Sequence, residues 1–408
     1  MIGTGSLVFT FLRLSARPAE RTTDYSRFFP FLRDIMLDKE SSLRLKLLRF
    51  PPIIGVLYIH AYGMTINYAG GTLGNADING LTEFIRTLIS QGLARTAVPL
   101  FFLMSGYLFF ANFQWSQQTY GKKILTRFRT LLVPYLFWNI LAFGILALGQ
   151  AIPIIRPYFT GASTPIADYI GWYDYLNALF GLKGYPIAYH FWFIRDLLLL
   201  VLLAPVIAVI LRYAPLPFFI GVFLCWVCDV WPVPPPAVMA WGWGVVPVFL
   251  PAAMSVFFFA AGAFCGIKGK SLFALDTYGT AALIAYVPIV LVDAIWYTAW
   301  FNVYLHRTGL LVGVAAALYS TRLIARHELL SNWIVALGGT SFFVYAAHEP
   351  LLGLVRTFAY KFIPLDGAYT MLLLYLTLPV LVIVVLVLCH RMLTLLCPRA
   401  LSLVTGGR

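Results

Sequence analysis

The chain has 408 residues, of which 61% are hydrophobic, 16% aromatic and only 11% charged. An ordinary soluble domain carries roughly 25% charged residues, because water must solvate its surface. This composition excludes a soluble globular protein and indicates that lipid solvates much of the surface. Since one transmembrane helix needs about 20 mostly apolar residues, about ten crossings would use half of the chain.

The segment before the first long apolar run, residues 1–48, has an apolar patch at 6–12 followed by five arginines. A secretory signal places its positive charges before the apolar region, so this order does not match one. We expect residues 1–48 to be a cytoplasmic lead-in, 49–398 to be the membrane domain and 399–408 to be a cytoplasmic tail.

Ten long apolar runs predict an all-α, polytopic membrane helix bundle of about ten transmembrane helices. The runs cover residues 50–67, 97–113, 131–155, 191–211, 214–233, 244–267, 277–300, 309–324, 333–358 and 369–396. Prolines in or near several of these runs indicate kinks around cavities.

The distribution of Lys and Arg supports this arrangement. With the N-terminus inside, the segments assigned to the cytoplasm hold 21 of the 29 Lys and Arg residues, and the outside loops hold five. The positive-inside rule therefore favours ten helices with both termini in the cytoplasm. The same topology explains the net charge of +13, and no nucleic-acid-binding motif is present, so we expect no nucleic-acid partner.

The five cysteines do not form a framework of bridges or a metal site. Cys225 and Cys228 have the spacing of a redox or zinc pair, but they lie in an apolar stretch without a second pair. We interpret them as packing residues and predict no metal.

Ionisable side chains at membrane depth invite a functional interpretation, because charge in hydrocarbon is costly. The alternative is that each pairs with a neighbour and holds helices together. These residues are His60, Arg95, Arg195, Asp196, Asp293, His348, Glu349 and Arg356. For the adjacent Arg195 and Asp196 the structural interpretation is favoured, since neighbours on a helix point in different directions and each should need its own partner.

His60 is the side chain best suited to general-base chemistry, because a neutral imidazole accepts a proton near neutral pH. Arg49 precedes it with ten residues between them, about 16 Å along a helix that rises 1.5 Å per residue. This spacing suggests that Arg49, at the membrane surface, binds an anionic cofactor, and that His60, deeper in the membrane, is the base that contacts the reactive end of the cofactor. Further basic residues follow at the same predicted face, although the positive-inside rule alone also explains them. They are Lys122, Lys123, Arg127 and Arg129.

Five segments, in chain order, resemble the acyltransferase-3 family of bacterial membrane O-acyltransferases. They are the Arg49-x10-His60 pair, AVPLFFLMSGY at 97–107, RFRTLLVPYLFWN at 127–139, HFWFIRDL at 190–197 and SFFVYAAH at 341–348. Some family members carry Arg-x-x-Arg before the third helix, whereas here Thr130 follows Arg127 at that spacing. The basic role would then be carried by Arg127 with Arg129 or Lys123.

The resemblance implies transfer of an acyl group, most often acetyl from acetyl-CoA, to a hydroxyl of a carbohydrate, exopolysaccharide or lipid-linked glycan at the bacterial inner membrane. It implies a catalytic group in which His60 is the general base, assisted by Arg95, Tyr345 and His348. The residues expected to bind the acyl-CoA are Arg49, Lys123, Arg127 and Arg129. The residues expected to contact substrate are Ser105, Tyr107, Trp192, Arg195 and Asp196.

A secondary transporter or flippase of a glycan or small anion is the alternative, because kinked helices and ionisable residues at the midplane suit both classes. The Arg49 and His60 pair, with the basic residues near it, favours the acyltransferase, since a proton-coupled carrier has no particular need of them. The sequence does not identify the acceptor, the acyl group or the oligomeric state.

Overall fold

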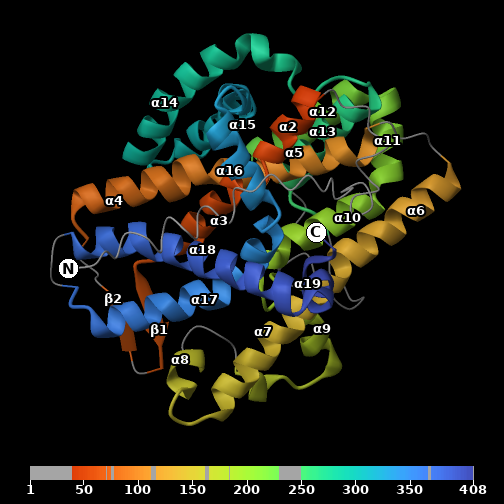
Figure 1. The fold of residues 1–408 in the computed structure, drawn as a ribbon. Coiled ribbons are helices and arrows are strands. Elements are labelled where there is room, and N and C mark those ends of the chain that lie inside the picture. The colour runs from red at the N-terminus through yellow and green to blue at the C-terminus, as the bar shows by residue number, and fades with distance from the viewer. Residues whose placement is uncertain are drawn as a thin grey trace, which may run out of the picture. The chain divides into compact units, whose positions relative to one another are not determined.

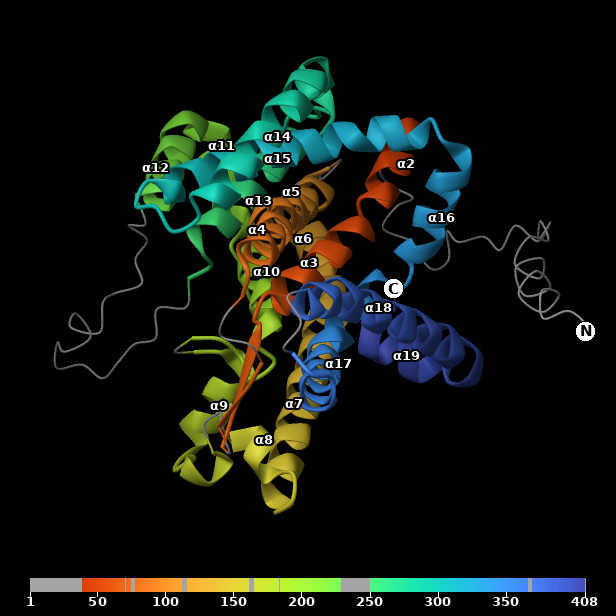
Figure 2. The ribbon, with the colours of Figure 1, turned by 90° about the vertical axis from the view of Figure 1, so that its left-hand side faces the viewer.

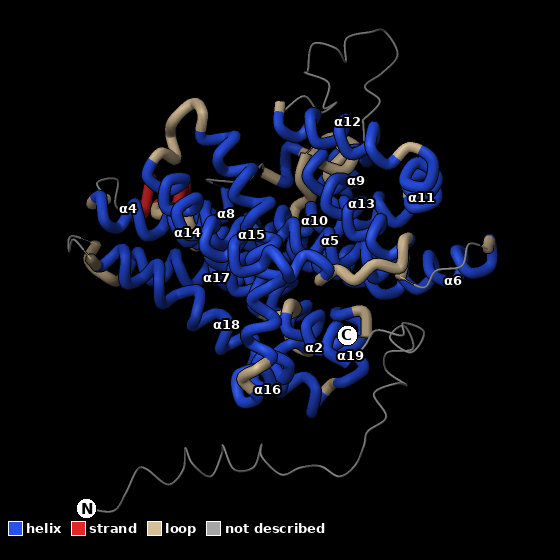
Figure 3. Tube along the Cα trace, turned by 90° about the horizontal axis from the view of Figure 1, so that it is seen from above, coloured by secondary structure: helices blue, strands red, loops and turns tan. Residues whose placement is uncertain are grey.

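The computed structural model describes residues 39–69, 71–74, 78–111, 116–160, 165–182, 184–228, 250–365 and 369–407. The predicted lead-in up to residue 38 lies outside them, as do residues 229–249, where the fifth predicted helix ends and the sixth begins. Helix makes up nearly all of the regular structure (Figure 3), and the only strands among the described residues form one short hairpin.

The elements follow one another along the chain as labelled in Figure 1. The first half contains α2 (Lys39–Leu47), α3 (Pro51–Ala61), β1 (Thr65–Tyr68), β2 (Gly71–Gly74), α4 (Gly80–Thr87), α5 (Ala97–Phe110), α6 (Gln117–Arg127), α7 (Val133–Ala151), α8 (Arg156–Thr160) and α9 (Trp172–Phe180). The second half contains α10 (Trp192–Leu202), α11 (Ala204–Tyr213), α12 (Pro215–Val227), α13 (Ala253–Ile267), α14 (Gly279–Ile295), α15 (Asn302–Ala325), α16 (Glu328–Gly338), α17 (Ser341–Phe362), α18 (Thr370–Leu396) and α19 (Pro398–Thr405).

Each of the ten predicted apolar runs contains a helix, and the all-α membrane bundle is confirmed. Within the described residues, five helices are long and apolar enough to cross a membrane, or seven if each of two bent pairs is one span. Two shorter apolar helices, α12 and α13, add to these. The count of ten crossings and the cytoplasmic termini stay predictions.

Two predicted helices are broken by sharp bends. The fourth predicted run bends by 63° between α10 and α11, where Pro205 begins the new helix. The ninth predicted run bends by 59° between α16 and α17, around Gly339 and Thr340. A proline cannot continue the hydrogen-bond ladder and glycine resists helix formation, which accounts for both positions.

The second predicted helix begins much earlier than its apolar run. Residues Gly80–Phe110 form one continuous helical segment, which includes a π-helical turn at Leu88–Leu93. Asn79 caps its start by accepting a hydrogen bond from the Thr82 amide at 2.8 Å. Arg86 is therefore in α4, and Arg95 lies within the helical segment. The apolar run did not include residues 80–96, because the first turns of this helical segment are polar.

α5 and α13 pack closely against each other. A Cβ added at Gly106 would overlap the backbone of Phe259, and one added at Gly262 would overlap the backbone of Leu103. Small residues at a membrane helix interface allow this close approach, and dispersion then holds the pair together. The AVPLFFLMSGY segment thus includes a packing site.

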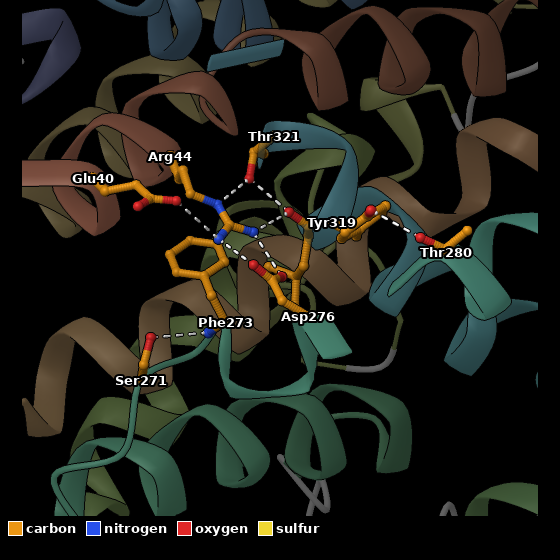
Figure 4. A network of polar contacts seen from close by, with 9 residues as sticks. Glu40, Arg44, Ser271, Phe273, Asp276, Thr280, Tyr319 and Thr321 are labelled. Carbon is orange, nitrogen blue, oxygen red and sulfur yellow. Dashed lines mark hydrogen bonds and ion pairs between the residues drawn. The ribbon is translucent and has the colours of Figure 1, made fainter. Parts of the chain in front are cut away.

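The buried Arg44, which is only 3% exposed, joins α2 to α15 and to the segment before α14. Its guanidinium donates to both carboxylate oxygens of Asp276, at 2.5 and 2.9 Å, and to the Thr321 hydroxyl at 2.9 Å (Figure 4). The ring of Phe273 lies beneath it at 3.8 Å. This network fixes the segment that leads through Arg49 into α3.

α3 lies between the α4 to α5 segment and the α17 and α18 pair (Figure 2). After α3 the chain enters the antiparallel β1–β2 hairpin, in which Thr65 pairs with Gly74. The hairpin extends beside α8, and the rings of Tyr68 and Tyr158 stack there. The first predicted helix was expected to reach residue 67 but ends at Ala61, so that His60 lies in its last turn.

Candidate active site

A cavity of about 880 Å³ opens beside the end of α3. Its polar lining comprises His60, Gln91, Arg95, Thr298, Asn302, His306, Arg307 and His190. Its aromatic lining comprises Phe101, Tyr185, Tyr189, Trp192, Phe193, Trp226, Tyr297, Trp300 and Tyr345. No carboxylate is among the described residues that line it, so cationic and neutral groups determine its electrostatics.

His60 is held by a chain of two hydrogen bonds. Its Nδ1 lies 2.7 Å from the Tyr189 hydroxyl, and that hydroxyl donates to Oε1 of Glu349 at 2.7 Å. Because the tyrosine proton is used toward the carboxylate, the hydroxyl accepts from Nδ1–H of His60. The Nε2 atom of His60 therefore carries the lone pair that can take a proton.

His348 lies directly behind His60, with the ring centroids 5.1 Å apart. It is fully buried, and its Nδ1 lies 2.6 Å from the backbone carbonyl of Tyr345 in the preceding turn. Among the described residues, neither Nε2 of His348 nor Oε2 of Glu349 has a hydrogen-bond partner, although both atoms are buried. A third imidazole, that of His190, has its ring centroid 5.0 Å from that of His348.

Arg95 lines the same cavity without a neutralising acid. Its Nε and Nη2 donate to Oε1 of Gln91, at 2.8 and 2.5 Å. Within the described part of the chain, no carboxylate forms an ion pair with it. A partly buried cation held by a neutral amide is costly unless negative charge arrives with a ligand or develops during a reaction.

Two contacts from α17 fix the neighbourhood of His60. Arg356 donates to the carbonyl oxygen of Gly63 at 2.9 Å, just beyond the end of α3, where a cation is favourable. The hydroxyl of Tyr345 donates to the backbone carbonyl of His190 at 2.6 Å. The second contact links the SFFVYAAH segment to the HFWFIRDL segment, and the first ties α17 to the residues that follow His60.

The wall of the cavity formed by α14 and α15 holds a further imidazole, that of His306. The Nδ1 of His306 lies 2.9 Å from Oδ2 of Asp293, whose residue is only 3% exposed. Asn302 donates to the other oxygen of the same carboxylate at 2.7 Å. Asp293 thus orients the two polar side chains that reach the cavity from this side.

The structure brings part of the predicted catalytic group together. His60, Arg95 and Tyr345 line the cavity, His348 packs against His60, and Trp192 lies in the aromatic wall. Ser105 and Tyr107 are not among the lining residues, and Tyr107 lies at the contact between α5 and α13. Their roles toward substrate stay predictions.

Arg195 and Asp196 pair with each other, which corrects our expectation that each would need its own partner. The Arg195 side chain folds back so that Nη2 lies 3.1 Å from Oδ1 of Asp196, and its Nη1 donates to the carbonyl of Gly181 at 3.0 Å. Asp196 also accepts from the Ser255 hydroxyl at 3.1 Å. A long arginine can reach its neighbour in sequence where a short side chain could not, and the pair joins α10 to α13. Neither residue lines the cavity.

The four basic residues expected to bind acyl-CoA do not line the His60 cavity either. Lys123 donates to the carbonyl of Phe109 at 2.5 Å and so caps the end of α5. Arg127 lines a separate, smaller pocket of about 140 Å³ together with Arg195. Arg49 lies two residues before α3, beside Gly338 of α16, while Arg129 follows Arg127 in the helical segment that leads into α7.

Sequence reasoning missed several residues of the site. Tyr189 precedes the histidine of the HFWFIRDL segment, so adjacency to a motif was the available signal. Glu349 was noted among the ionisable residues at membrane depth but was not assigned to the site. Gln91 and His306 carried no such signal, because their partners are set by tertiary packing.

Fold and site together place a histidine cluster in a multi-pass membrane helix bundle. The comparisons with known proteins give the class of protein. The acyltransferase-3 family model, described as an acyltransferase domain, matches residues 43–391. The chain therefore belongs to this family, and the protein is an acyltransferase that transfers groups other than aminoacyl groups.

A named relative spans almost the same length. The chain is 25% identical over 390 residues to the succinoglycan biosynthesis protein ExoH of Rhizobium meliloti (strain 1021), which covers 91% of this chain and 94% of the relative. No solved structure matches the chain.

Proposed function

We propose that this protein transfers an acyl group, acetyl in the first instance, from a cytoplasmic acyl-CoA to a hydroxyl of an exopolysaccharide or lipid-linked glycan at the bacterial inner membrane. Family membership supports the reaction class, and the name of the ExoH relative supports a polysaccharide acceptor. The observation that carries the mechanism is the chain of hydrogen bonds from Glu349 through Tyr189 to His60.

His60 acts as the general base. Its Nε2 takes the proton from the acceptor hydroxyl as the oxygen attacks the thioester carbonyl carbon. The new carbon–oxygen bond gives a tetrahedral oxyanion, which collapses with cleavage of the carbon–sulfur bond, and the CoA thiolate recovers the proton from His60. Tyr189 and Glu349 keep the imidazole in the tautomer that this step needs and stabilise the imidazolium that it forms.

Arg95 stabilises the oxyanion. The guanidinium shares the cavity with His60 and has a neutral amide as its hydrogen-bond partner, so its charge is available to the negative charge that develops on the carbonyl oxygen. A donor already in place makes this interaction stronger than in water, because it needs no reorganisation.

His348 and Tyr345 act as positioning residues in this proposal. His348 packs against the ring of His60, and Tyr345 holds the backbone of His190. Neither needs to contact the reacting atoms to set the orientation of the base.

The acceptor occupies the aromatic part of the cavity. Trp192, Tyr185 and Trp300 offer ring faces on which sugar rings can stack, and Asn302 and His306 offer polar atoms for hydroxyl groups. Such a lining of aromatic surface with a few oriented polar groups is typical of small-molecule sites.

The acyl donor approaches from the other end of α3. Arg49 precedes the helix and His60 lies in its last turn, so a phosphate held at Arg49 leaves about 16 Å for the thioester arm to reach the base. Arg127 and Arg129 add positive charge for the remaining phosphates.

The test is transfer by the purified full-length protein. Labelled acetyl-CoA is incubated with the protein and a panel of bacterial glycans, and label in the glycan fraction is measured. We expect transfer that saturates with acetyl-CoA. Failure to bind any acyl-CoA, together with glycan or anion uptake in proteoliposomes, would contradict the proposal and favour the transporter alternative.

A further inference from the structure

Two side chains of α17, His348 and Glu349, lie close to His60 at the cavity wall. His60, His348 and Glu349 each offer a ligand atom, and these atoms all lie within 4.8 Å of one another. A tetrahedral zinc site with bonds of about 2.0–2.1 Å needs ligand atoms about 3.4 Å apart. Binding therefore requires the most widely separated of these atoms to move closer together.

The hydrogen bonds around this cluster leave one possible ligand atom of His348 and one of Glu349 unused. Nε2 of His348 and Oε2 of Glu349 are buried without a hydrogen-bond partner among the described residues, and an unpaired buried polar atom is unfavourable. The other atom of each group is already engaged, by the Tyr345 carbonyl and the Tyr189 hydroxyl.

These outer contacts match the second shell of a metal centre. A histidine that binds a metal through one ring nitrogen usually donates its other N–H to a carbonyl or carboxylate, and a ligating carboxylate is usually hydrogen-bonded as well. Nδ1 of His348 contacts a carbonyl, Nδ1 of His60 contacts Tyr189, and Oε1 of Glu349 accepts from the same tyrosine.

We propose that His60, His348 and Glu349 bind one divalent transition-metal ion of the zinc type, and that the bound ion inhibits acyl transfer. Two imidazoles and one carboxylate are a ligand set that zinc favours, with a fourth position left for water. Inhibition follows because the ion occupies the Nε2 lone pair of His60 that would otherwise accept the acceptor's proton. The binding site stands by itself, whereas its inhibitory effect rests on the proposed function.

Binding is tested with Co²⁺ and Zn²⁺ on the tag-free full-length protein in detergent. We expect one Co²⁺ per chain, with a visible absorption band that Zn²⁺ displaces. His348→Ala and Glu349→Gln should each weaken Co²⁺ binding about tenfold or more. His327→Ala is the matched control, because it removes an exposed histidine before α16 and should leave binding unchanged.

Equal Co²⁺ binding by the wild type and Glu349→Gln would overturn the proposed site, and so would the absence of any protein-bound absorption band. Glu349→Gln preserves the size of the side chain, so it keeps the test decisive if His348→Ala does not fold. In the activity assay, Zn²⁺ should stop transfer and a chelator should restore it. Metal binding at this site without loss of transfer would contradict the role of His60 as base, and would leave the metal site intact.

Discussion

The Nδ1 atom of His60 lies 2.7 Å from the hydroxyl of Tyr189. The two residues are 129 positions apart in the chain, and the same hydroxyl donates to Glu349, a further 160 positions on. Three distant segments of the chain thus meet at the imidazole of His60. Its Nδ1 is used in this contact, so Nε2 is the atom that can accept a proton.

Tyr189→Phe should lower kcat about 10-fold to 100-fold, because it removes a hydrogen bond that supports a charged imidazolium. The Michaelis constant for the acyl-CoA should stay near the wild-type value, since the hydrogen bonds of Tyr189 are to His60 and Glu349. Steady-state kinetics at saturating acceptor measures both. A rise in that Michaelis constant with kcat intact would refute the proposed relay.

Arg95→Ala should lower kcat about 100-fold to 1,000-fold, the range found when a donor to an oxyanion is removed. Arg95→Lys keeps the charge and should recover part of this loss. Gln91→Ala, which removes only the amide that holds Arg95, should have a smaller effect. Equal rates for the alanine and lysine variants of Arg95 would show that its charge does not act in the reaction.

Arg49→Ala and Lys123→Ala should fail in different ways. Loss of Arg49 should raise the Michaelis constant for acetyl-CoA roughly 10-fold, as expected for a lost charge-assisted hydrogen bond to phosphate. Loss of Lys123 should mainly lower the thermal unfolding temperature, because its ammonium caps α5 through the Phe109 carbonyl. If loss of Arg49 lowered the unfolding temperature and loss of Lys123 raised the Michaelis constant for acetyl-CoA, Lys123 would be the phosphate-binding residue and Arg49 the structural one.

His306→Ala should raise the Michaelis constant for the glycan acceptor several-fold and leave that for acyl-CoA unchanged. Asp293→Asn should act in the same direction, since it weakens the contact that orients His306 at 2.9 Å. Titrating each substrate separately distinguishes the two constants. A change only in the Michaelis constant for acyl-CoA would indicate that the donor, rather than the acceptor, binds at the α14 and α15 side of the cavity.

Arg44→Ala should destabilise the fold by about 3 kcal/mol, because it leaves Asp276 without its partner. A fall in the unfolding temperature of the detergent-solubilised protein reports this change. Arg326→Ala removes an exposed arginine at the end of α15 and serves as the control. If both variants melt like the wild type, the network at Arg44 is not a main tie between α2 and the bundle.

Much of the helical framework could be predicted from sequence, because apolar runs of sufficient length have one stable structure in lipid. The start of the second helix could not, since Gly80 to Arg95 is polar enough to resemble a loop and becomes helical by packing between α3 and α14. The bends at Leu203 and Gly339 likewise depend on local breakers within runs of high hydropathy.

The candidate site was predictable where it consists of ionisable residues, because charged side chains inside a membrane are energetically unfavourable. His60, Arg95 and His348 were found because ionisable groups at membrane depth are rare. Tyr189 was missed because a tyrosine in an aromatic outer segment looks like interfacial anchoring, and only the tertiary fold brings it to His60 and Glu349. The pairing of Arg195 with Asp196 was missed because it depends on one side-chain conformation.

The most direct test of the account is His60→Ala, assayed for acyl transfer and for acyl-CoA binding in the same preparation. The account predicts that transfer falls about 100-fold or more while the dissociation constant for acetyl-CoA is unchanged, since His60 moves a proton and does not hold the donor. Transfer within a few-fold of the wild type would contradict it.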